Sequence, residues 1–195
     1  MTDAQPDAAA PLFHVSAQAL AVGQRLRSYT ISTDYAALIR LAGEALNGGP
    51  EAIRCLLTSD AFARLQGQGG YQVEMVLLEA AFERARARSA PQLPSRLEAV
   101  YVWRTLALAR QFRAAYRPDG IIHRCALVTG TAIERDGALV AAGIDLTRPL
   151  VEELAQVERR AARYWRAHEP MLLPEMLVRG TVVVEAVVAA GGHEG

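Results

Sequence analysis

Three short apolar stretches each hold one side chain that could take part in chemistry. His14 lies within LFHVSA, residues 12–17, Tyr101 lies within LEAVYVW, residues 97–103, and Glu175 follows a proline and precedes a valine-rich run. Groups of these kinds serve as hydrogen-bonding, stacking and electrostatic elements of catalytic sites. Each also has a structural explanation, as a core histidine, a strand aromatic and a solvated turn acid. The sequence therefore offers a candidate site only if the fold brings the three together.

Several common catalytic and metal sites are not indicated. No two histidines have the spacing of helical metal ligands, and the HExxH, GxSxG, GxGxxG and Walker-lysine patterns do not occur. We therefore expect no metal site and no Rossmann or P-loop nucleotide site. Cys55 lies in an amphipathic stretch and Cys125 in an alternating one, so both are expected to be core thiols. His123 is expected to be structural.

The composition is that of a globular domain without a dominant charge. The chain has 195 residues, of which 51% are hydrophobic and 22% charged, and its 21 basic and 21 acidic side chains give a formal net charge of zero. This balance gives no global attraction to nucleic acid or membranes, although a local basic patch is not excluded. The chain has two isolated cysteines, and it has no apolar run of the roughly 20 residues needed to span a bilayer. We therefore expect a reduced, cytoplasmic protein. We expect a disordered lead-in at 1–11, one domain over 12–188 and a disordered tail at 189–195.

Helices are expected to dominate the first half of the chain. A helix capped by Thr33 or Asp34 runs through YAALIRLAGEAL and stops at NGGP, and EAIRCLL forms a shorter one. QGQGG, residues 66–70, is expected to break the chain before the clearest helix, residues 71–88. These elements make up a helical segment over residues 34–90.

The candidate site residues lie on expected strands. Strands are expected at 12–17, 97–103 and 121–128, and the last strand follows PEM near the C-terminus. Helices are expected at 104–116 and from about 149 until Pro170, where Tyr164 and Trp165 serve as packing groups. RDG, residues 135–137, is expected to turn a hairpin. The mixture indicates an α+β fold around a modest sheet.

The order of these residues on their elements resembles a known superfamily. A histidine on a first strand, a tyrosine on a middle strand and a glutamate starting a late strand resemble the ADP-ribosyltransferase superfamily. The class is the one with a His-Tyr-Glu triad, shared by diphtheria toxin and the poly(ADP-ribose) polymerases. The stretches FHVS, PSRLEAVYVW, YW and PEMLVRGTVVV resemble more closely a bacterial group of uncharacterised domains placed in that superfamily. The resemblance covers residues 12–30 and 94–188 and implies a split antiparallel sheet with a helical segment inserted in the first half.

The resemblance implies a role for each candidate residue in binding and cleaving NAD, with no metal. His14 would hydrogen-bond a ribose hydroxyl, and Tyr101 would stack on the nicotinamide ring, with Phe112 as a second aromatic across the ring. Glu175 would accept a hydrogen bond from the nicotinamide ribose and stabilise it as it becomes oxocarbenium-like. Arg96 would hold a phosphate.

The sequence also departs from the superfamily pattern in two places. Val15 follows the histidine where the polymerases have a glycine whose backbone grips the carboxamide. Ala109 stands where the polymerases often have a serine that helps to hold the carboxamide. Ser16 or Ser95 would have to replace this contact. Arg96 also has a structural explanation, pairing with Glu98 or capping the sheet edge.

The resemblance implies transfer of ADP-ribose to an acceptor that the sequence does not name. A macromolecular acceptor would suit a toxin, an effector or a phage-defence factor, whereas water would make the protein an NAD glycohydrolase. One alternative is an RNA 2′-phosphotransferase-like enzyme on the same fold. The other is an inactive module that binds a nucleotide or a partner. The oligomeric state and the role of residues 34–90 stay open.

Overall fold

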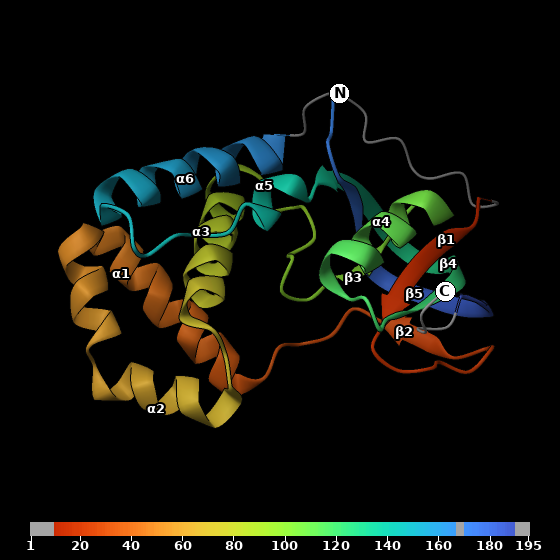
Figure 1. Cartoon of the computed structure of the whole chain (residues 1–195), viewed down its shortest axis with the longest axis horizontal. Helices are drawn as coiled ribbons and strands as arrows, with labels where there is room; N and C mark the ends of the chain where they lie inside the picture. The colour runs from red at the N-terminus through yellow and green to blue at the C-terminus, as the bar shows by residue number, and fades with distance from the viewer. Residues whose placement is uncertain (1–9, 167–169, 190–195) are drawn as a thin grey trace. The chain divides into compact units, whose positions relative to one another are not determined.

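The computed structural model describes residues 10–166 and 170–189, and over these the chain has an α+β fold of six helices and one five-stranded antiparallel sheet (Figure 1). The predicted lead-in and tail fall almost entirely outside the described residues, although Ala189 ends the last strand. The described chain divides into two compact units. Residues 10–29, 98–135 and 171–189 form the sheet unit, and residues 30–97, 136–166 and 170 form the helical unit. No helix in the described part is long and apolar enough to cross a membrane.

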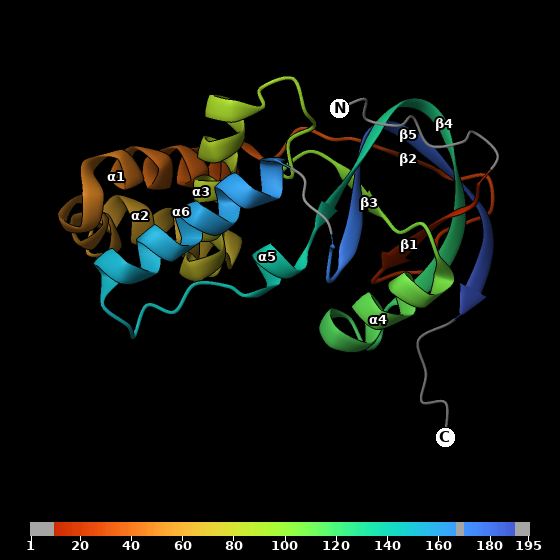
Figure 2. The ribbon, with the colours of Figure 1, turned by 90° about the horizontal axis from the view of Figure 1, so that it is seen from above.

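The helical unit holds more of the chain than the segment expected from the sequence. Its helices are α1 (Thr33–Leu57), α2 (Asp60–Gly69), α3 (Val73–Ser89), α5 (Ala138–Ala141) and α6 (Leu150–Arg166). Helix α3 packs against both α1 and α6, as Figures 1 and 2 show. The Trp165 indole N–H donates to the Phe82 carbonyl at 2.7 Å, and the Tyr164 ring meets the Phe82 ring edge-on. Both aromatics of α6 are thus packing groups, as predicted.

Capping side chains and glycines determine where these helices begin and bend. Ser32, one residue before the predicted caps, is the N-cap of α1, where its hydroxyl accepts from the Tyr35 N–H. The predicted stop at NGGP is a kink inside α1, where Gly49 has a non-helical φ of 81°. Helix α2 was not predicted from the sequence, and it begins where the Ser59 hydroxyl accepts from the Phe62 N–H.

The sheet unit holds the five strands of the described residues, except for Asp136 at the end of the fourth strand. They are β1 (Leu12–Ser16), β2 (Arg25–Arg27), β3 (Val100–Val102), β4 (Ile121–Asp136) and β5 (Pro174–Ala189). Their order is β1-β4-β5-β2, and β3 pairs with β5 along the same edge as β2. Helix α4 (Leu106–Tyr116), whose N-cap is Thr105, packs near β1.

Two glycines allow the long central strands to pass very close to each other. A Cβ on Gly130 would lie 2.1 Å from the Arg179 carbonyl oxygen, and a Cβ on Gly180 would lie 2.0 Å from the Thr129 carbonyl oxygen. Both glycines also have positive φ. Figure 2 shows how strongly β4 and β5 curve. The prediction of a hairpin at RDG is wrong, because β4 continues to Asp136 and the chain then enters the short helix α5.

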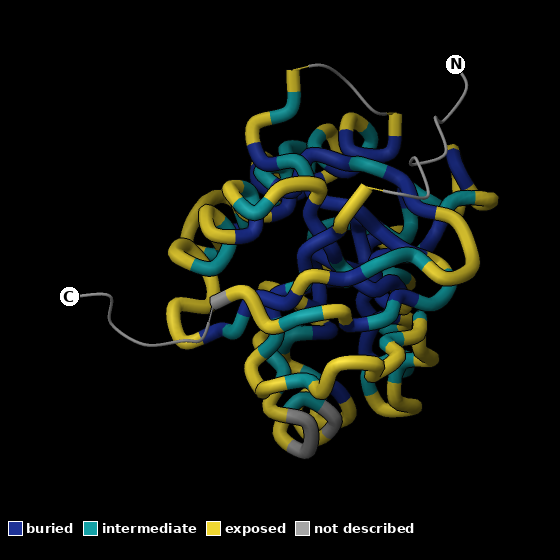
Figure 3. Tube along the Cα trace, turned by 90° about the vertical axis from the view of Figure 1, so that its right-hand side faces the viewer, coloured by how far each residue is buried: buried dark blue, intermediate teal, exposed yellow. Residues whose placement is uncertain are grey.

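The sheet has two distinct buried faces. One face carries a core around Leu12, Val100, Val102 and Met176. The other carries Phe13, Val15, Trp103, Ile122 and Ala109 of α4. Figure 3 colours the buried parts of the chain dark blue. Because side chains alternate along a strand, each site residue can be assigned to one of these faces.

Candidate functional site

The candidate site lies where strands β1 and β3 form one backbone bridge and then diverge. Phe13 and Trp103 exchange two backbone hydrogen bonds of 2.8 and 2.7 Å, which form an isolated antiparallel bridge. A continued ladder would next bring the Val15 N–H to the Tyr101 carbonyl. That carbonyl is instead bonded to the His14 ring, at 2.8 Å from Nδ1. The imidazole thus fills the place where the next backbone bond between the two strands would form.

This bond fixes the state of the His14 ring. A carbonyl oxygen can only accept, so Nδ1 carries the proton and, in the neutral ring, Nε2 is an acceptor. Burial lowers the pKa of His14 below its ordinary 6.5, and the nearby charges of His123 and Arg117 lower it further, whereas the bond to Tyr101 acts in the opposite direction. At neutral pH the site therefore holds a neutral imidazole in one tautomer.

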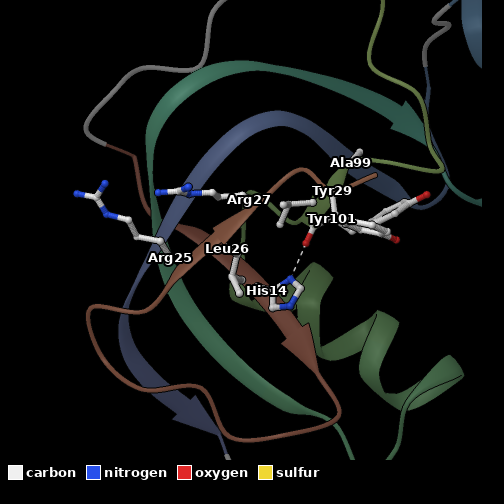
Figure 4. Close-up of a pocket in the computed structure, with 8 residues that line it drawn as sticks. His14, Arg25, Leu26, Arg27, Tyr29, Ala99 and Tyr101 are labelled. Atoms are coloured by element: carbon white, nitrogen blue, oxygen red, sulfur yellow. Dashed lines mark hydrogen bonds between the residues drawn. The ribbon is translucent and has the colours of Figure 1, made fainter. Parts of the chain in front are cut away.

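A pocket of about 340 Å³ opens beside this histidine. Among the described residues, those that line it are His14, Arg25, Leu26, Arg27, Tyr29, Ala99, Val100 and Tyr101. Figure 4 shows the two arginine side chains extending to one side and the two tyrosine rings to the other, with His14 below. Sequence reasoning missed the contribution of β2, although the alternation Arg-Leu-Arg before Ser28 is the pattern of a half-buried strand with both arginines on one face.

Tyr101 and Glu175 lie on the same face of the sheet. Tyr101 is paired with Leu177 across β3 and β5, and Glu175 lies two residues before Leu177 on β5. Such diagonal neighbours are roughly 7–8 Å apart. Glu175 is only 7% exposed, so its interpretation as a solvated turn acid is wrong. Of the described residues, Glu175 is not among those that line the pocket.

His14 projects from the opposite face of the sheet. It alternates with Phe13 and Val15, whose side chains pack with Trp103 and under α4, and it shares the face of Leu12. Tyr101, in contrast, packs against the cluster of Phe13 and Trp103. The structure therefore brings His14 and Tyr101 together around one pocket, whereas Glu175 lies on the Tyr101 face of the sheet, opposite to the face of His14.

The other residues expected to contact nicotinamide do not gather around one point. The Phe112 ring packs on the Trp103 ring with centroids 4.3 Å apart, on the Tyr101 face of the sheet. The side chain of Val15 is buried against Gly120, but its backbone lies at the parting of β1 and β3. The Ser16 hydroxyl donates to the Gln18 carbonyl. Ala109 is fully buried on the inner side of α4.

Arg96 and Ser95 belong to the helical unit, unlike the other candidates. The Arg96 guanidinium is buried, bonds both carboxylate oxygens of Glu79 at 3.2 Å and donates to the Tyr164 hydroxyl at 2.8 Å. The predicted partner Glu98 lies in the sheet unit. The Ser95 hydroxyl donates to Glu83 at 2.9 Å. These groups already have partners within their own unit, so the arginines of β2 are better placed than Arg96 to hold a phosphate beside His14.

Cys125 and His123 lie in the core of the protein, whereas Cys55 does not. Cys125 is buried, and burial raises the pKa of its thiol to about 12, so it is a poor nucleophile. The prediction for Cys55 is wrong, because this residue is exposed on α1 while its neighbours Ile53 and Leu56 point inward. His123 is fully buried, and its Nε2 accepts the Leu20 N–H at 3.1 Å. No cluster of metal-binding side chains occurs within residues 10–166 and 170–189.

The two histidines predict a dependence of stability on pH. Burial lowers the pKa of both His14 and His123 below 6.5, so below that pH the unfolded chain binds more protons than the folded one. We expect the free energy of unfolding to fall as the pH drops from about 7 to 5. His123→Gln keeps an acceptor for Leu20 and should make this slope shallower, by at most about 1.4 kcal/mol per pH unit for one proton. Urea unfolding at several pH values measures the slope, and an unchanged slope in the variant would contradict the assignment.

Comparison with known proteins places the chain in a family. A family model described as "Protein of unknown function (DUF2441)" matches residues 53–190. The chain belongs to the DUF2441 family. The DUF2441 match includes Tyr101, Phe112 and Glu175, whereas His14 and the arginines of β2 precede it. No curated protein matches the chain.

Proposed function

We propose that the sheet unit binds NAD at the parting of β1 and β3 and cleaves the bond between nicotinamide and ribose, transferring ADP-ribose to an acceptor. The observation that carries this proposal is the hydrogen bond of 2.8 Å from His14 Nδ1 to the Tyr101 carbonyl. It leaves Nε2 of a neutral imidazole as an acceptor for a ribose hydroxyl. It also supports the resemblance to the ADP-ribosyltransferase superfamily, whose histidine and tyrosine would act on one ligand.

The Tyr101 face supplies the groups for the nicotinamide end. In the proposal, nicotinamide stacks on Tyr101 near Phe112, and Glu175 accepts a hydrogen bond from its ribose. When the glycosidic bond breaks, neutral nicotinamide leaves with the bonding electron pair and positive charge develops on the ribose. The fixed, buried carboxylate attracts this charge more strongly than it attracts the ground state. The acceptor then attacks the anomeric carbon and loses its proton.

The arginines of β2 suit the diphosphate of the dinucleotide. Arg25 and Arg27 line the same pocket as His14, on the side away from the tyrosine rings (Figure 4). A guanidinium binds phosphate oxygens through paired N–H donors. In the proposal NAD therefore crosses the opening, with its phosphates at β2 and its nicotinamide toward β5.

Two other functions are each favoured by one observation. The cations around His14 would also suit an RNA 2′-phosphotransferase-like enzyme, which must hold phosphates beside its histidine. A module that binds a nucleotide without chemistry is favoured by the position of Glu175, which does not line the pocket among the described residues.

Calorimetric titration with NAD tests the proposed binding site. We expect the intact protein to bind NAD. The double variant Arg25→Gln with Arg27→Gln should bind NAD about tenfold or more weakly, because each charge-assisted hydrogen bond contributes about 1.5–3 kcal/mol. Arg124→Gln is the matched control, since it removes a charge on β4 outside the pocket. Equal loss in the control, or no binding by the folded intact protein, would contradict the proposal.

A further inference from the structure

Positive charge is concentrated in the sheet unit, although the whole chain is neutral. The described residues of the sheet unit hold nine arginines against five acidic side chains, a formal charge of four positive. The described residues of the helical unit hold twelve arginines against twelve acidic side chains and are neutral. Such a local excess favours an anionic partner for the sheet unit.

Helix α4 carries much of this excess as one stripe. Arg110, Arg113 and Arg117 are spaced i, i+3 and i+7, and they extend about 10 Å along the helix and its C-terminal cap. Arg110 and Arg117 are exposed and Arg113 is partly exposed, and no acidic residue occurs within α4. The nearest acid in sequence is Asp119, which lies after the helix. The stripe thus presents successive guanidinium groups along one line.

An exposed aromatic lies beside the end of this stripe. Tyr116 is 48% exposed, and its ring contacts Phe112 with centroids 5.3 Å apart. The contact with Phe112 orders the ring while leaving about half of the residue open to solvent. Ordered aromatic rings next to lines of positive charge are the usual means of binding single-stranded nucleic acid, because bases stack on the rings and phosphates pair with the cations.

The C-terminal end of the stripe lies near β1, because a Cβ built on Gly120 would be 2.8 Å from Val15 Cγ1 and 3.3 Å from Arg117 Cβ. Arg117 is close enough to His14 for its positive charge to help lower the pKa of the imidazole. Arg25 and Arg27 flank the same pocket. Both groups of arginines lie within the sheet unit.

We propose that α4 binds a single strand of nucleic acid, with its phosphates along the stripe of Arg110, Arg113 and Arg117 and a base on Tyr116. An anionic membrane is a weaker candidate, because the apolar side of α4 is turned inward against the sheet and leaves little to insert among lipids. The binding goes beyond the proposed NAD chemistry and does not depend on it.

Fluorescence anisotropy with a labelled mixed-sequence RNA oligonucleotide of about 15 nucleotides tests the surface on the intact protein. We expect salt-dependent binding that weakens at least fivefold in the double variant Arg110→Gln with Arg117→Gln. The plot of log K against log salt should become shallower by about 1.4, since each phosphate contact to a single strand contributes about 0.7. Tyr116→Ala should weaken binding severalfold with an unchanged salt slope, because stacking involves no counterion release.

Controls separate this surface from a general effect of charge. Arg40→Gln removes an exposed arginine of the helical unit and should leave binding unchanged. A matching DNA strand tests whether the surface requires RNA, and equal binding of both supports backbone and stacking contacts. Absence of oligonucleotide binding, equal loss in Arg40→Gln, or binding to vesicles of anionic phospholipid in preference to the oligonucleotide would each overturn the proposal.

Discussion

Glu175→Gln is expected to lower the rate of nicotinamide release from NAD by about 10²–10³-fold while the protein still binds NAD. The amide keeps the shape of the carboxylate and a hydrogen-bond acceptor, but it loses the charge that stabilises the oxocarbenium-like ribose. Removal of one preorganised stabilising group typically has an effect of this size. The charge acts strongly because Glu175 is buried on β5, where solvent screening is weak. Initial rates by chromatography, with NAD affinity by calorimetry, measure the two parts separately.

The same strand provides a matched control for this experiment. Glu185 is an exposed acid ten residues later on β5, where it pairs with Arg124 at the surface. Glu185→Gln should release nicotinamide at nearly the rate of the unaltered protein. The role of Glu175 would be refuted by a wild-type rate in Glu175→Gln, or by an equal loss in Glu185→Gln. Thermal unfolding of both variants separates a catalytic loss from a folding defect.

Gly180→Ala is expected to have the largest effect on stability, a loss of more than about 4 kcal/mol or failure of the sheet unit to fold. The new Cβ would lie 2.0 Å from the Thr129 carbonyl oxygen and 2.8 Å from the Gly130 Cα. Both are backbone atoms in the centre of β4, so no side-chain rotation relieves the overlap. The φ of 154° at Gly180 is also one that L-residues rarely adopt. Denaturant unfolding monitored by circular dichroism gives the change in free energy.

Gly43 of α1 is the control for the glycine substitution. No heavy atom lies within 4 Å of a Cβ built there, and the residue is helical. Gly43→Ala should leave stability unchanged or raise it by about 0.5–1 kcal/mol, because alanine loses less backbone entropy on folding. A stability of Gly180→Ala within 1 kcal/mol of the unaltered protein would show that the two central strands do not pass as closely as the structure has them.

Local sequence signals predicted the longer elements because the interactions that define these elements are local. The break at NGGP, the helix over 71–88 and the helix ending before Pro170 all follow from capping, turn residues and apolar spacing. Strand β2 and helix α2 escaped prediction because three and ten residues give little periodicity. The residue types of RDG predict a turn within a hairpin, whereas in the structure this segment leads from β4 into α5.

The candidate site was predicted as far as its residues lie on well-defined strands. His14 and Tyr101, separated by 87 positions, do meet, because β1 and β3 share the bridge between Phe13 and Trp103. The assignment of Arg96 to a phosphate overlooked Glu79, a buried partner on α3 that no local pattern connects to it. Arg25 and Arg27 were overlooked because the pocket they line exists only after β2 joins β5.

The central claim, that the parting of β1 and β3 is a site of NAD cleavage, is tested most directly by incubating the intact protein with NAD and measuring free nicotinamide. We predict release in molar excess over the protein, together with loss of release in His14→Ala. A correctly folded protein that binds NAD but yields no nicotinamide above the protein-free control would contradict the account.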